Sequence, residues 1–361
     1  MPNKIKYSLS CYTIKDKNII RSYSEPIINI NQPYAISASD PGYGRNKKPY
    51  SSKIPYTEDR CCKKTWLSSN GKILELMWIA DGHGGDTVVQ IVYTRFGLYF
   101  DEIANSFLGE QFNVIDILLM VFERIHFDLN KRKLEFSHCG STLTTCVIDM
   151  ETKMAYFANL GDSVCQVIRD EKCIFRTRDQ DASSNIEQKR ILEVYHNADY
   201  NVTVKQLFGF SDNSNVWRFL PTGIIPLGGF GDYASDKVPG CIRRIPEIST
   251  LQLIEGDIVI LSSDGLFEVM NTNILTPGRD ESEIVHNVIS YKNNPLQNID
   301  LSTYLIQEHI SSLIIQAKNH PYFRHLSIDD IRNIILNAKD NCSVITFEIP
   351  IEQKLVRCIS S

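Results

Sequence analysis

The stretch ILELMWIADGHGGD, residues 73–86, starts with a nearly continuous apolar run and ends in an acid followed by glycines. A short apolar run that stops at a turn predicts a buried strand, here ending at Asp81. Asp86 stands where it would cap a helix. Apolar residues then recur at helical spacing, at Val88, Val92, Phe96, Tyr99, Ile103 and Phe107. The stretch therefore predicts a strand, a turn that carries Asp81, and an amphipathic helix.

Outside this stretch, the pattern of apolar residues predicts an alternation of short strands and longer helices. Helices are expected at 113–131, 184–196, 281–290 and 300–318. Strands are expected at 141–149, 154–160, 163–169, 172–176, 248–254, 257–263, 342–348 and 353–358. The remaining segments are weakly patterned strands and loops at 1–36, a loop at 37–57, and an irregular insertion at 197–245. Because no strand–helix–strand regularity is present, the chain is expected to form α+β layers and not a doubly wound sheet.

Composition excludes several classes of protein. The chain has 361 residues, 38 Lys and Arg against 43 Asp and Glu, and a net charge of -5. An acidic chain without a basic run is a poor nucleic-acid binder. The first residues, MPNKIKYSLS, lack the apolar core of a secretory signal, and no apolar stretch is long enough to span a bilayer. Ten cysteines without CxxC spacing indicate reduced thiols and no zinc site. We therefore expect an intracellular protein, cytoplasmic or nuclear, without a membrane partner.

Acidic residues mark five motifs, which are YTED at 56–59, the WIADGHGGD already described, FANLGDS at 157–163, ILSSDGLFEV at 260–269 and KDNCSVI at 339–345. Most of these acids follow an apolar run and precede a Gly or Asn turn, which places carboxylates at one rim of a sheet. The candidate ligands are Glu58, Asp59, Asp81, Asp162, Asp264, Glu268 and Asp340. Gathered carboxylates repel one another unless divalent cations compensate them, and Mg²⁺ and Mn²⁺ prefer oxygen ligands.

A two-metal hydrolytic site needs a bridging carboxylate, further acids that leave water positions open, and a proton donor for the leaving group. Asp81 is the best bridging candidate because a strand and a glycine turn fix it on either side. Gly82 has no side chain to block approach to its carbonyl oxygen. His83 titrates near neutral pH, which suits donation of a proton to a departing alkoxide.

Each acid also has a structural explanation when it is taken alone. An Asp-Gly pair is commonly only a turn, and a histidine after a strand is commonly a surface residue. Asp264 could cap the following helix, while Glu268 could be exposed on a helix and Asp340 could lie in a loop. The order of the five motifs, four of them at strand–turn junctions, favours the functional interpretation.

These motifs together resemble the PPM family of metal-dependent serine/threonine protein phosphatases, type 2C. The resemblance covers about 35–350 and lies in an acidic pair followed by glycine- and aspartate-rich motifs in a fixed order. Those motifs are Glu58–Asp59, DGHGG at 81–85, GSTLTT at 140–145, LGDS at 160–163, SDGLFE at 263–268 and DNCSVI at 340–345. The segment RDQDASSNIEQKRI at 178–191 is similar to a further family segment, with Gln180 in place of a His.

The resemblance implies a role for each matching residue. Asp81 would bridge two metals, and Asp264 with Asp340 would complete one of them. Glu58 and the Gly82 carbonyl would hold the other metal. Asp59 would contact a metal through water. Asp162 would lie at a third and weaker metal position together with Asp264. Glu268 stands where the family usually has Asp, and would bind a metal directly or through a neighbouring group. His83 would be the general acid. Ligand type alone does not separate Mg²⁺ from Mn²⁺.

The resemblance also implies a fold and an activity. The fold is a central β-sandwich of two antiparallel sheets flanked by helices, in one domain over 1–361 with an N-terminal extension at 1–34 and a flap at 197–245. The activity is removal of phosphate from phosphoserine and phosphothreonine of proteins by metal-activated hydroxide, without a phosphoenzyme, by a monomer. Two alternatives stay open, which are a pseudophosphatase adaptor that binds phosphoproteins without turnover, and a phosphatase of small molecules.

Two further positions depart from the family pattern. Ile54 stands where the family has an Arg that holds the substrate phosphate as a fork. We expect either weaker positioning of the phosphate, because a lysine offers only a point charge, or a loop shift that brings Lys53 or Arg45 into this role. In PLGGFGDY, 226–233, Gly228 stands where another Arg is usual.

Overall fold

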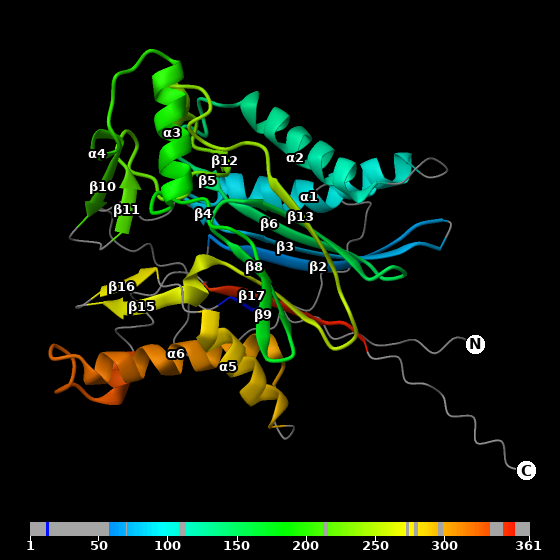
Figure 1. The fold of residues 1–361 in the computed structure, drawn as a ribbon, viewed down its shortest axis with the longest axis vertical. Helices are drawn as coiled ribbons and strands as arrows, with labels where there is room; N and C mark the ends of the chain where they lie inside the picture. The colour runs from blue at the N-terminus through cyan, green and yellow to red at the C-terminus, as the bar shows by residue number, and fades with distance from the viewer. Residues whose placement is uncertain are drawn as a thin grey trace, which may run out of the picture.

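Two five-stranded antiparallel sheets are stacked at the centre of the molecule (Figure 1). The computed structural model describes residues 12–13, 58–69, 71–107, 113–211, 216–271, 274–277, 281–294, 299–332 and 342–350. In sheet I the strand order is β13 (Glu247–Gln252), β7 (Met154–Leu160), β6 (Leu143–Asp149), β3 (Ile73–Ala80) and β2 (Arg60–Leu67). In sheet II the order is β1 (Tyr12–Thr13), β17 (Ser343–Glu348), β14 (Ile258–Ser262), β8 (Val164–Arg169) and β9 (Lys172–Arg176).

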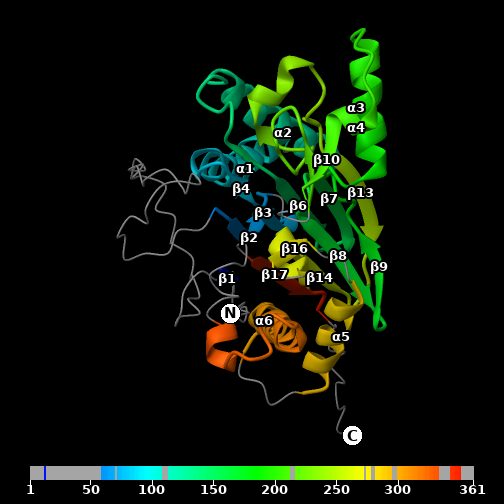
Figure 2. The ribbon, with the colours of Figure 1, turned by 90° about the vertical axis from the view of Figure 1, so that its left-hand side faces the viewer.

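Helices cover the outer face of each sheet, so the layers run helix, sheet, sheet, helix (Figures 1 and 2). The helices over sheet I are α1 (Thr87–Ser106) and α2 (Val114–Asn130). Those over sheet II are α5 (Glu281–Lys292) and α6 (Leu301–Asn319). The predicted fold class, a β-sandwich of two antiparallel sheets flanked by helices, is confirmed. In the parts of the chain that the structure describes, no helix combines the length and apolar character needed to cross a bilayer.

Strand β3 shows why its sequence is apolar on both sides. Leu76 and Trp78 pack against the α1 and α2 layer, whereas Met77 and Ile79 point between the sheets. Successive side chains of a strand face opposite ways, so a strand covered on both faces needs an unbroken apolar run. Burial of one such side chain stabilises the fold by about 1.5–3 kcal/mol. This run therefore fixes the strand at the centre of the stack, directly before Asp81.

The core between the sheets is built from the inward-facing residues of both. Phe157 of sheet I stacks on Phe175 with ring centroids 4.2 Å apart. The larger set is Met77, Ile79, Cys146, Ile148 and Phe157 from sheet I with Cys165, Val167, Val259, Leu261, Ile345 and Phe347 from sheet II. This shared core holds the two sheets in one alignment, which also aligns the ends of their strands.

The segment between β9 and β13, here called the flap region (177–246), packs around its own hydrophobic cluster. Its elements are α3 (Asn185–Asn197), α4 (Val204–Leu207), β10 (Phe208–Ser211), β11 (Val216–Phe219), β12 (Phe230–Gly231) and the 3-10 helix η1 (Tyr233–Lys237). Tyr195, Phe208 and Phe219 supply the aromatic centre of the cluster. The expected irregular insertion at 197–245 is thus a set of very short elements, too short to show a period.

Three short strands join the flap region to the sandwich. Strand β12 pairs with β5 (Gly140–Ser141), and β5 pairs with β4 (Gly82–His83). Figure 1 shows these strands and the flap region at one end of the stacked sheets, with the hairpin of β15 (Glu268–Asn271) and β16 (Ile274–Pro277) at the same end. The DGHGG turn therefore lies where the flap region meets sheet I.

Candidate functional site

The expected acids lie where strands of both sheets end. Asp81 directly follows β3 of sheet I, and Asp162 lies in the turn by which β7 of sheet I leads to β8 of sheet II. Asp264 begins η2 (Asp264–Phe267), just after β14 of sheet II. The turns that carry these three acids therefore lie at ends of strands in both sheets. Asp264 acts electrostatically on Asp162 as well as on His83, so these side chains share one neighbourhood.

Thr142 connects two of the acidic motifs. Its backbone N–H donates to the Asp81 carbonyl at 2.8 Å, and its Oγ1 accepts from the Asp81 N–H at 3.1 Å. The same Oγ1 lies 2.9 Å from Oγ of Ser163, the neighbour of Asp162. The GST motif therefore holds the Asp81 and Asp162 turns together through a residue without charge.

Glu58 lies against the glycine turn. Its Oε1 accepts from the Gly85 N–H at 2.8 Å, and its backbone carbonyl accepts from the Gly82 N–H at 3.2 Å. A Cβ at position 82 would lie 2.8 Å from the Glu58 carbonyl oxygen and from Val89 Cβ, which is closer than real side chains pack. Glycine is therefore required at position 82 by close packing. That its carbonyl binds a metal stays a prediction.

Asp59 is buried and joins the two sheets at this end. Ser263 Oγ donates to Asp59 Oδ2 at 2.7 Å, and the same Oγ accepts from the Ser343 N–H at 3.0 Å. The Ser263 N–H also donates to the Ser343 carbonyl at 3.1 Å. Because Asp59 precedes β2 of sheet I, Ser263 follows β14 and Ser343 begins β17, this network ties the sheets together beside the acids.

Asp162 is the acid whose electrostatics are most unusual. It is 9% exposed, and burial raises the pKa of its carboxyl well above the ordinary value, with further contributions from the negative charges of Asp264, Asp181 and Asp179. Burial and like charge both oppose ionisation. A divalent cation is the partner that would reverse both effects. The chemistry of these donors therefore fits a cation that prefers oxygen ligands.

A closed set of metal ligands is not seen in the described residues, where no three His, Cys, Asp or Glu side chains come close enough to hold an ion. The structure does not describe the side chains of several predicted site residues. Asp340, Lys53, Arg45 and Ile54 lie outside the described residues, and of Glu268 only the backbone, at the start of β15, is described. The ligand set therefore remains a prediction.

The interpretation of Asp86 as a helix cap is partly wrong. Asp86 does occupy the N-cap position of α1, but its side chain makes no capping hydrogen bond there, and its backbone is helical with φ -89° and ψ -6°. A capping side chain needs an extended backbone to reach the free N–H groups of the first turn.

Sequence reasoning assigned no role to Asp232, which the structure places beside His83. The Asp232 carboxylate oxygen Oδ2 lies 2.7 Å from His83 Nε2. Burial lowers the pKa of His83, but the charge and hydrogen bond of Asp232, with the charges of Glu58 and Asp264, outweigh it, so that the pKa is raised. The signal was present in the sequence, because Asp232 ends GGFGD as a further acid after glycines.

Gln180 and Gly228, two departures from the family pattern, lie in contact, and the Gln180 side chain fills the space that a side chain at position 228 would need. Gln180 is fully buried; its Oε1 accepts from the Gly161 N–H at 3.0 Å, and its Nε2 donates to the Asn159 carbonyl at 3.2 Å. A Cβ at position 228 would overlap the Gln180 side-chain oxygen. The amide thus braces the turn that carries Asp162 and leaves no room for a side chain at position 228.

Gly228→Ala is therefore expected to destabilise the protein by about 1–3 kcal/mol, the usual cost of an overpacked interior. Equilibrium unfolding in urea would measure this loss. The control is the same substitution in a Gln180→Ala background, because removal of the Gln180 amide frees most of the space that a Cβ at position 228 needs. Gly228→Ala should cost less in that background than in the wild type. An equal cost in both backgrounds would show that the overlap with Gln180 is not its cause.

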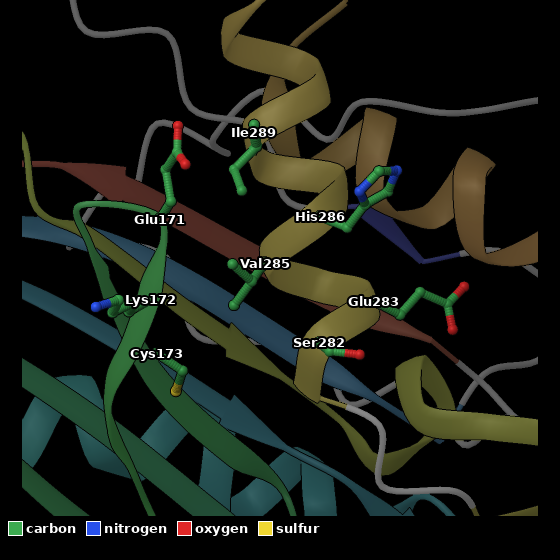
Figure 3. Close-up of a pocket in the computed structure, with 8 residues that line it drawn as sticks. All are labelled: Glu171, Lys172, Cys173, Ser282, Glu283, Val285, His286 and Ile289. Atoms are coloured by element: carbon green, nitrogen blue, oxygen red, sulfur yellow. The ribbon is translucent and has the colours of Figure 1, made fainter.

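The pocket in Figure 3 is a different place, between the β8–β9 turn and α5. Lys172 and Cys173 line one side, and Val285, His286 and Ile289 of α5 line the other. None of its lining residues belongs to the predicted site.

Comparison with known proteins identifies the family to which the sequence is similar. Residues 55–276 match the Protein phosphatase 2C family. The Drosophila willistoni protein "Protein phosphatase PTC7 homolog fig" is 25% identical over 278 residues, 74% of this chain and 72% of its own length. The Arabidopsis thaliana "Probable protein phosphatase 2C 69" is 27% identical over 208 residues, 56% of this chain, which spans about half (51%) of that relative.

A solved structure supports the fold alone. "Structure of a C.elegans sex determining protein" superimposes with a TM-score of 0.57 at 20% identity, and covers 86% of this chain and 64% of that one. The family match itself covers more than half of the sequence. The chain belongs to the protein phosphatase 2C family, whose members are metal-dependent serine/threonine phosphatases.

Proposed function

We propose that this chain removes phosphate from phosphoserine and phosphothreonine of proteins, at the acidic end of the sandwich and with Mn²⁺ or Mg²⁺. The observation that carries the proposal is the buried Asp162 carboxyl, whose raised pKa reflects burial and the nearby charges of Asp264, Asp181 and Asp179. A fold seldom keeps such a cluster unless a bound group compensates it. Family membership supports the same chemistry.

Two metals would be held by oxygen donors from both sheets. We assign Glu58, Asp81 and the Gly82 carbonyl to one, with Asp81, Asp264 and Asp340 on the other. Asp162 would serve a third and weaker ion beside Asp264. Asp59 and Glu268 would act through neighbouring groups. When bound, such ions neutralise phosphate charge and lower the pKa of water toward neutrality.

The remaining steps belong to the protein. His83, whose pKa is raised by the charge and hydrogen bond of Asp232, would donate a proton to the departing serine or threonine oxygen. Lys53 or Arg45 would hold the phosphate in place of the usual Arg. Phosphorylated proteins are the proposed substrates, and a monomer the proposed state.

The test is hydrolysis of a phosphothreonine peptide by the purified full chain with Mn²⁺, with Mg²⁺, and with EDTA. Turnover is expected only with the ions. At least one of the variants Lys53→Ala and Arg45→Ala should raise the KM for the phosphopeptide, and an unchanged KM in both would exclude both residues as replacements for the usual Arg. A folded chain that binds the phosphopeptide without turnover under every ion would contradict the proposal and indicate an adaptor. Turnover of small phosphorylated metabolites, but not of the phosphopeptide, would indicate a phosphatase of small molecules.

A further inference from the structure

A buried carboxylate faces the proposed proton donor. Asp232 is 3% exposed, and its Oδ2 lies 2.7 Å from His83 Nε2. Within the described residues its other oxygen, Oδ1, is buried and has no hydrogen-bond partner. The Asp232 N–H donates to the Cys139 carbonyl at 3.1 Å, which anchors the residue from behind. The histidine is thus the principal partner of a carboxylate that is otherwise costly to bury.

The backbone is arranged to deliver this carboxylate. Asp232 has φ 52° and ψ 35°, a left-handed conformation that L-residues rarely adopt. Gly231 before it has φ 76°, and a Cβ there would overlap the Cys139 carbonyl. Strain of this kind is retained where the surrounding structure demands it, often at functional sites.

Gly140 leaves the space in which the pair meets. In the three-stranded sheet it lies between the other two strands, opposite Gly231 on one side and His83 on the other. A Cβ at position 140 would overlap both Asp232 Oδ2 and His83 Nε2. The contact therefore depends on a glycine from the GST motif and on a left-handed turn from the flap region.

We propose that Asp232 is the positioning residue for His83, an inference that rests on the proposed function. The carboxylate accepts the Nε2–H and so fixes the orientation and tautomer of the ring. Nδ1 is then the nitrogen that releases its proton to the departing oxygen. After transfer the ring is neutral, with Nε2–H still bonded to Asp232 and a lone pair on Nδ1, and solvent returns the proton.

The experiment compares aryl phosphates with leaving groups of different basicity, using the full chain with Mn²⁺. Phenyl phosphate needs a proton on its leaving oxygen, whereas 2,4-dinitrophenyl phosphate does not. Asp232→Asn should lower kcat for phenyl phosphate by about 10²-fold, the lower range for a general acid, and hardly change it for the dinitrophenyl ester. His83→Asn should show the same pattern, and the double variant should be no slower than His83→Asn.

Asp236→Asn is the matched control, because Asp236 lies on η1, the 3-10 helix that begins directly after Asp232, and pairs with Arg244 at 3.0 Å. This variant should leave kcat unchanged for both phenyl phosphate and 2,4-dinitrophenyl phosphate. If His83→Asn shows no dependence on the leaving group, the general-acid part of the proposed function fails. If His83→Asn shows it and Asp232→Asn does not, the positioning role alone is wrong.

Nitrogen NMR of His83 in the unaltered, metal-free protein gives a second test that needs no variant. The neutral ring should carry its proton on Nε2. A ring protonated on Nδ1 would overturn the proposal, whether or not Asp232→Asn folds.

Discussion

Asp81→Asn is expected to lower turnover by about 10³-fold, the upper range for loss of one group that stabilises the charge of a transition state. The amide keeps the shape of the side chain but removes the charge that would bridge two cations. The fold should survive, because the hydrogen bonds between the Asp81 backbone and Thr142 do not involve the Asp81 side chain. The variant therefore separates loss of ion binding from loss of structure.

Steady-state kinetics and calorimetric titration with Mn²⁺ would measure the two effects of Asp81→Asn. Asp116→Asn is the control, since Asp116 is an exposed acid in the first turn of α2. The control should retain wild-type turnover and ion affinity. Wild-type ion affinity in Asp81→Asn would show that Asp81 is not a ligand.

Glu187→Gln is expected to cost about 3 kcal/mol of stability, the lower end for breaking a buried ion pair. Glu187 is 0% exposed and is bound by three arginines, with Arg190 Nε at 2.6 Å, Arg243 Nη2 at 2.8 Å and Arg178 Nη1 at 3.4 Å. The lower end applies because the arginine side chains are 21–30% exposed and stay partly hydrated. The loss should loosen α3 from the rest of the flap region.

The pH dependence of this effect has a definite sign. Burial raises the pKa of Glu187, but Arg190 and Arg243 lower it by more, so the net shift is downward. The contribution of Glu187 to the unfolding free energy is therefore fully present above the pKa of its carboxyl in the unfolded chain, near 4.5. It is lost as pH falls through the lower pKa of the same carboxyl in the folded state.

Urea unfolding of wild type and Glu187→Gln at pH 7 and at pH 4 would check both predictions. The difference in unfolding free energy should shrink at the lower pH. Glu193→Gln, at an exposed position on the same helix, should have almost no effect. A difference below about 1 kcal/mol at pH 7 would place Glu187 among ordinary surface ion pairs.

The sequence predicted the elements whose period is long enough to read. The strand at 73–80 is β3 (Ile73–Ala80), and the helix after it buries Val88, Val92 and Phe96 as expected. The helix at 113–131 is α2 (Val114–Asn130). Strand β2 and the β15–β16 hairpin were not anticipated; the side chains of β2 are mostly half-buried and show no alternation. The strand expected at 353–358 lies outside the described residues.

The acids of the site were readable for a local reason, since most of them follow an apolar strand and precede a turn. Their partners were not. Asp59 meets Ser263 across 204 positions, and His83 meets Asp232 across 149. Such contacts depend on how the sheets stack and where the flap region folds back. A single sequence gives spacing along the chain but not distance in space.

Acids drawn from two stacked sheets limit how this chain can change in length over evolution. One residue inserted into a core strand would advance the strand by about 3.3 Å and turn its side chains to the opposite face. Either change in β7 or β14 would separate Asp162 from Asp264, whatever residues filled the core. Insertions and deletions among descendants of this sequence should therefore gather in surface turns and the flap region, while the strands that lead to the acids keep their length.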